Sequence, residues 1–82
     1  MLSENVVVGP IMEKNANYIP ELVQIACKFD SRIEILFDNK RVNVKSIMGI
    51  MALYFSGGES ITIQADGADE VDAVKAINEF LV

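Results

Sequence analysis

Apolar and polar positions alternate along some stretches of this chain and recur at helical spacing along others. The run Val6-Val7-Val8, stopped by Gly9-Pro10, predicts a first strand from about Leu2 to Val8. The stretch from Gly9 to Asn17 has no clear period, so we expect a loop there. The next segment, Tyr18 to Phe29, is predicted to be a helix with Pro20 in its first turn. Its apolar residues are Ile19, Leu22, Val23, Ala26 and Cys27.

The middle of the chain predicts a hairpin followed by a short helix. Ile33, Ile35 and Phe37 alternate with Arg32, Glu34 and Leu36, which predicts a strand with one mostly buried face. Asp38-Asn39 then predicts a tight turn into a second strand, Lys40 to Val44. Ser46 precedes an apolar group and suits the N-cap of a helix. That group consists of Ile47, Met48, Ile50, Met51 and Leu53, and Ser56-Gly57-Gly58 is expected to end the helix.

The last third predicts one more strand and one more helix. Ser60 to Ala65 alternates, and Asp66-Gly67-Ala68 forms a turn into a helix whose first turn carries Asp69, Glu70 and Asp72. Its apolar stripe consists of Ala73, Val74, Ile77 and Leu81. The order strand, helix, strand, strand, helix, strand, helix predicts an α+β fold. We expect a single domain over residues 1–82, with an antiparallel sheet and the helices layered on one face.

Charge and composition narrow the classes of partner. The 82 residues include 12 acidic and 7 basic side chains, a net charge of -5. No basic run is present, which argues against direct binding of nucleic acid or of an anionic membrane surface. Cys27 is the sole cysteine, and neither a signal peptide nor a membrane span is evident, so we expect a cytoplasmic protein.

The residues offer little for catalysis, metal binding or cofactors. The chain has no histidine, and its carboxylates are scattered, so an enzyme is the reading with the least support. The acidic residues Asp66, Asp69, Glu70 and Asp72 are better interpreted as a solvated helix start than as a metal site. Cys27 is interpreted as a small residue packed in the core, and Ser56-Gly57-Gly58-Glu59 lacks the lysine of a phosphate-binding loop. We expect no metal, cofactor or small-molecule substrate.

The segment around Ser46 resembles a known family. Asn43 and the run Lys45-Ser46-Ile47-Met48-Gly49-Ile50-Met51 are similar to the regulatory serine segment of HPr proteins, the phosphocarriers of the bacterial sugar phosphotransferase system. Further segments look like the same family: Leu22-Val23-Gln24, Lys28-Phe29-Asp30-Ser31, Asp38-Asn39-Lys40, Ile61-Thr62-Ile63 and Gly67-Ala68-Asp69-Glu70. The resemblance covers most of the chain and implies a four-stranded antiparallel sheet with three helices on one face, in the order βαββαβα.

The chain departs from that family at the phosphorylation loop. The family's loop reads close to Gly-Ile-His-Ala-Arg-Pro-Ala, and the aligned residues here are Glu13 to Ile19. Asn15 takes the histidine position and Asn17 takes the arginine position. Imidazole accepts and donates a phosphoryl group near neutral pH, whereas an amide nitrogen is neither basic nor nucleophilic. The resemblance therefore implies a family member that does not relay phosphate.

Two functional readings remain open. In the first, the protein is a regulator in carbon catabolite control, either switched by phosphate on Ser46 or constitutively bound to a partner. Its implied partners are an HPr kinase and a transcriptional regulator. Ser46 reads equally as a plain N-cap, and the two roles are compatible. The resemblance implies that Ile47, Met48 and Met51 face the partner, although a core role is the alternative. In the second reading only the fold is kept, and residues 12–20 bind the partner without a switch.

Overall fold

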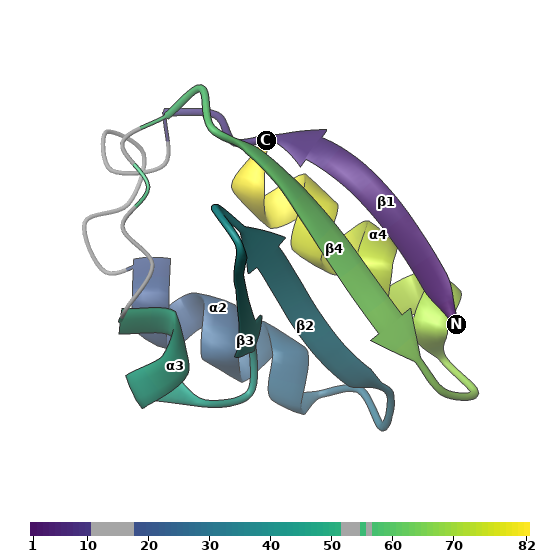
Figure 1. Cartoon of the computed structure of the whole chain (residues 1–82). Coiled ribbons are helices and arrows are strands. Elements are labelled where there is room, and N and C mark those ends of the chain that lie inside the picture. Colours follow the sequence, from purple (N-terminus) through teal and green to yellow (C-terminus); the bar gives the residue numbers. More distant parts are fainter. Residues whose placement is uncertain (11–17, 52–54, 56) are drawn as a thin grey trace.

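A computed structural model describes residues 1–10, 18–51, 55 and 57–82 of the chain (Figure 1). The described elements follow in the predicted order, with boundaries within two residues of those expected. They are β1 (Leu2–Val7), α2 (Tyr18–Cys27), β2 (Arg32–Phe37), β3 (Lys40–Asn43), α3 (Ile47–Met51), β4 (Ser60–Asp66) and α4 (Glu70–Leu81).

The four strands form one antiparallel sheet in the order β1-β4-β2-β3. The last strand, β4, lies between β1 and β2, so strands far apart in sequence are neighbours in space. α2 and α4 lie against one face of the sheet, and α3 packs beside β3 and α2 (Figure 1). This arrangement confirms the predicted α+β fold.

Alternation along the strands places their apolar side chains on the helix-covered face. Ile33 and Ile35 of β2 are buried, as are Ile61, Ile63 and Ala65 of β4. The register pairs Ile33 with Ala65 and Ile35 with Ile63, so these side chains share one face. The intervening residues of the same strands point to the open face, which is why one sheet face builds the core.

The helices bury most of the apolar residues that the helical spacing placed on one face. In α2 the buried residues include Leu22, Val23 and Ala26, and in α4 they are Ala73, Val74, Ile77 and Leu81. Tyr18, at the start of α2, is also buried, and its phenol oxygen accepts a hydrogen bond from the Phe55 amide at 3.3 Å. A buried polar tip with a partner is compatible with the apolar core around it.

The predicted turn between β2 and β3 is confirmed. Phe37 pairs with Lys40, so the loop consists of Asp38 and Asn39 alone. Both have positive φ, 52° and 63°, as a type I′ hairpin turn requires. Aspartate and asparagine tolerate this left-handed region better than most side chains do.

The position predicted for Cys27 is wrong, because its side chain is exposed and is not packed in the core. Leu22, Val23 and Ala26 define the buried face of α2. At about 100° per residue, Cys27 projects roughly a quarter-turn from the centre of that face. It is also the last residue of α2, two residues before the end predicted at Phe29. Helical spacing alone did not distinguish the edge of the apolar stripe from its centre.

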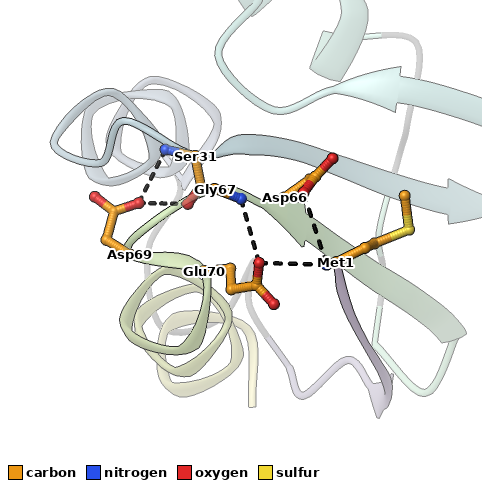
Figure 2. A network of polar contacts seen from close by, with 6 residues as sticks. All are labelled: Met1, Ser31, Asp66, Gly67, Asp69 and Glu70. Atoms are coloured by element: carbon orange, nitrogen blue, oxygen red, sulfur yellow. Dashed lines mark hydrogen bonds and ion pairs between the residues drawn. The ribbon is translucent and has the colours of Figure 1, made fainter.

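A polar network closes the end of the sheet where β4 leads into α4 (Figure 2). The carboxylate of Asp69 accepts hydrogen bonds from the backbone amides of Asp30 and Ser31, both at 2.9 Å, and from the Ser31 hydroxyl. These bonds, above all the one from the Ser31 side chain, lower the pKa of Asp69 below its ordinary value. Beside them, the Met1 ammonium lies 3.3 Å from Glu70 and 3.6 Å from Asp66.

The network corrects the interpretation of Asp69 as a solvated residue of the first helical turn. α4 begins at Glu70, and Asp69 makes no side-chain cap bond to that helix. Its carboxylate joins the α2–β2 connection to the β4–α4 connection, residues 38 and 39 positions apart. Within the described residues, no group of three or more cysteine, aspartate or glutamate side chains is placed to hold a metal ion.

Candidate regulatory site

Ser46 lies immediately before α3, where its sequence position predicted an N-cap. Its hydroxyl oxygen accepts a hydrogen bond from the Gly49 amide at 3.2 Å, and its carbonyl accepts one from Ile50 at 3.0 Å. The first bond satisfies an amide that has no acceptor inside the first turn of the helix, and the second is the first regular hydrogen bond of that helix. The predicted cap is thus confirmed.

The connection from β3 into α3 holds the backbone of Ser46 in place. The Ser46 amide donates to the Asn43 carbonyl at 3.0 Å, and the Lys45 amide donates to the Asn43 side-chain oxygen at 2.9 Å. Val44 between them is fully buried, and its amide bonds to the Ile33 carbonyl at 3.0 Å. The serine is half-buried on a well-anchored turn, and its hydroxyl lies beside the first amides of α3.

The side chain of Lys45 reaches from this turn to another helix. Its ammonium donates a hydrogen bond of 2.7 Å to the carbonyl oxygen of Phe29, just beyond the C-terminus of α2. No sequence pattern predicts this contact. Lys45 precedes Ser46 directly, but nothing in the spacing between positions 29 and 45 signals that they meet.

α3 presents an apolar set to solvent. Of its five residues only Ile50 is buried, whereas Ile47, Met48 and Met51 are 47%, 85% and 64% exposed. We call these three exposed residues the apolar patch. Neighbouring exposed apolar side chains on one short helix are typical of a surface that contacts another protein. Methionine suits such a surface because its flexible thioether adapts to different shapes.

The altered phosphorylation loop lies mostly outside the described residues. Asn15 and Asn17, which take the histidine and arginine positions, are both outside. Of the segment 12–20, the structure describes Tyr18, which is buried, Ile19, which is half-buried, and Pro20, which is exposed. The chemistry of the loop therefore follows from residue identity alone.

The structure also bears on membrane association. Among the residues described, no helix has both the length and the apolar character needed to cross a bilayer.

Comparison with known families supports the relationship that the sequence suggested. A family model described as the PTS HPr component phosphorylation site matches residues 2–82. The match spans every strand and helix described above.

Solved structures with the same fold are similar over nearly the whole chain. The phosphocarrier protein HPr from Bacillus anthracis is 36% identical, with a TM-score of 0.91 over 99% of this chain and 96% of that one. HPr-C-His from Thermoanaerobacter tengcongensis is 38% identical, with a TM-score of 0.89 over 99% of this chain and 91% of that one. Crh, the Bacillus subtilis catabolite repression HPr, is 34% identical, with a TM-score of 0.70 over 98% and 95%.

Proposed function

Because the chain belongs to the HPr family of the phosphotransferase system, we propose that it is a regulatory, partner-binding member of that family which does not carry phosphate on a histidine. It acts through the apolar patch of α3, with phosphorylation of Ser46 as its switch. The protein is not an enzyme in this proposal, and it needs no metal or cofactor.

The observation that carries the proposal is the complete absence of histidine from the 82 residues. A phosphocarrier needs a side chain that accepts a phosphoryl group and then releases it, and imidazole does both near neutral pH. Asn15, at the histidine position, has no nucleophilic lone pair on its amide nitrogen. Asn17 removes the cation that would help to hold phosphoryl oxygens.

Ser46 is well placed for the switch. A phosphate on its oxygen would add about -1.5 to -2 charges at neutral pH, at the positive end of α3. The new charge would lie beside Ile47 and Met48, which are exposed. It would weaken docking of an apolar surface and favour a partner that offers arginine. Since this chain has Asn17 where the family has arginine, the partner must supply that cation itself.

The partners in this proposal are proteins: an HPr kinase that modifies Ser46 and a transcriptional regulator that recognises the modified form. The similarity to Crh, the Bacillus subtilis catabolite repression HPr, supports a role in catabolite control. We place this role in the cytoplasm, since the single cysteine fits a reducing compartment.

The deciding experiment incubates the purified chain with an HPr kinase and ATP and measures the intact mass. We expect a gain of one phosphate in the wild-type chain and none in Ser46→Ala. A parallel incubation with phosphoenolpyruvate and Enzyme I should transfer no label. Failure of the kinase to modify the wild-type chain would favour the alternative, an unswitched interaction domain that binds through residues 12–20.

The apolar patch is tested by binding. Met48→Asp should abolish binding of a protein partner that docks on the apolar patch. The fold should stay intact, because Met48 is 85% exposed. Val71→Asp is the matched control, since Val71 is 65% exposed on α4. Equal loss of binding in both variants would show that α3 has no special part in docking.

A further inference from the structure

The C-terminus of α2 is contacted by a cation from another part of the chain. α2 has no basic residue in its last turn. Carbonyl groups at a helix end carry partial negative charge and are stabilised by a nearby cation. The Lys45 ammonium supplies one, because it lies 2.7 Å from the Phe29 carbonyl oxygen although the two residues are 16 positions apart.

The backbone around Lys45 is anchored, but its side chain can move. Asn43 accepts hydrogen bonds from the amides of Lys45 and Ser46, through its side-chain and backbone oxygens at 2.9 and 3.0 Å. A lysine side chain is a flexible four-carbon stem that ends in a compact charge. Movement of this ammonium therefore requires rotation of side-chain bonds only, with no change in the fold.

We propose that Lys45 couples phosphorylation of Ser46 to the C-terminal end of α2, by holding the Phe29 carbonyl when the serine is free and turning to the phosphate when it is modified. This inference rests on the proposed function of Ser46. Among the described residues, the acceptor of the ammonium is the neutral Phe29 carbonyl. A phosphate on the next residue offers three oxygens and nearly two negative charges, which makes it the stronger acceptor.

The two arginines are already engaged elsewhere. Arg32 and Arg41 both lie beside Glu34, at 4.0 and 3.7 Å. Glu34 occupies the open face of the sheet, since it alternates with the buried Ile33 and Ile35. Lys45 differs from both arginines because it is adjacent to the modified residue and bonded to a helix end.

The consequence is local loosening of the α2 terminus. The last amides there make long hydrogen bonds: Lys28 to Ile25 and Phe29 to Ala26, both at 3.2 Å. Without the ammonium on the Phe29 carbonyl, this final turn opens more often, and its amides exchange faster with solvent. α2 packs against α3, which carries the apolar patch.

Amide hydrogen exchange followed by NMR tests the coupling. Phosphoserine is incorporated at position 46 during translation, so the measurement does not depend on any kinase. We expect the amides of Lys28 and Phe29 to exchange about three- to tenfold faster in the phosphorylated chain than in the unmodified one. Failure of a kinase to act on Ser46 would refute the proposed function but leave this measurement interpretable.

Three variants separate coupling from a purely structural role of Lys45. In Lys45→Gln the two amides should exchange fast in both states, so phosphorylation adds nothing. Lys45→Arg retains a cation and should restore the difference between states. Lys75→Gln, at an exposed lysine of α4, should behave as wild type. Equal acceleration by phosphate in wild type and Lys45→Gln would overturn the proposal, as would unchanged exchange on phosphorylation of the wild-type chain.

Discussion

Removal of the Ser46 hydroxyl should destabilise the protein even in the absence of any partner. Ser46→Ala deletes the acceptor that bonds to the Gly49 amide at 3.2 Å. It leaves that amide to water or to no partner, because it lies in the first turn of α3, where helical acceptors are missing. Such cap deletions cost about 0.5–2 kcal/mol, and the long, half-buried bond favours the lower half of that range.

The predicted loss is large enough to measure. A change of 1 kcal/mol shifts the melting temperature of a domain this small by about 4–8 °C. We therefore expect Ser46→Ala to melt roughly 2–10 °C below wild type on this scaling. Ser46→Asp should recover most of the loss, because a carboxylate accepts the same hydrogen bond and also suits the positive end of a helix.

Thermal and urea unfolding of the three proteins, followed by circular dichroism, provides the test. The same data serve as a baseline for the experiments on the Ser46 switch. A functional effect of Ser46→Ala supports the switch only if it is larger than the effect expected from the lower stability of that variant. Indistinguishable stability of wild type and Ser46→Ala would refute the reasoning. It would show that the hydroxyl bond seen at Gly49 adds nothing over solvation of that amide.

Three further results are expected. Gly67→Ala should lower the unfolding free energy by about 1–3 kcal/mol, because the added Cβ would lie 2.6 Å from the Ser31 Oγ and 2.7 Å from its Cα; unchanged urea unfolding would contradict this. The pKa of Asp69 is lowered from 3.8 by hydrogen bonds, above all the one from the Ser31 side chain. The stability that the ionised Asp69 carboxylate contributes is therefore present above pH 3.8 and is lost as the pH falls through the lowered pKa. Asp69→Asn should reduce the loss of stability at acid pH. An unaltered pH dependence of the melting temperature would argue against this role of Asp69. Asn15→His with Asn17→Arg should recover at most weak phosphate transfer from Enzyme I, because Tyr18 and Ile19 also differ from the family loop. Full transfer would show that the positions of Asn15 and Asn17 alone matter.

Local features of the fold were predictable because their causes lie within a few residues. The alternation of Ile33 and Ile35 with polar residues dictates which side of β2 is buried, whatever its neighbours are. The turn at Asp38 and Asn39 follows from residues that tolerate positive φ. The cap at Ser46 needs only a hydroxyl and the amide three residues later.

The candidate site was predictable only in part. The apolar residues of α3 could be recognised in the sequence, but two turns or fewer of helix leave open which of them face the core. The structure decides this, since Ile50 is buried and Met48 is the most exposed of the apolar residues there. The prediction for Cys27 was wrong for a similar reason, because a residue at the margin of an apolar stripe was assigned to the core.

Sequence by itself determined the order of the elements, the buried faces of β2 and β4 and the loss of the phosphoryl-accepting histidine, since each depends on residue identity or short-range spacing. Tertiary structure alone decided that β4 lies between β1 and β2, that Asp69 bonds to Ser31, and that Lys45 reaches Phe29. The physical reason is distance along the chain. These contacts join residues 16 to more than 30 positions apart, and no local preference specifies which side chains meet once the core has packed.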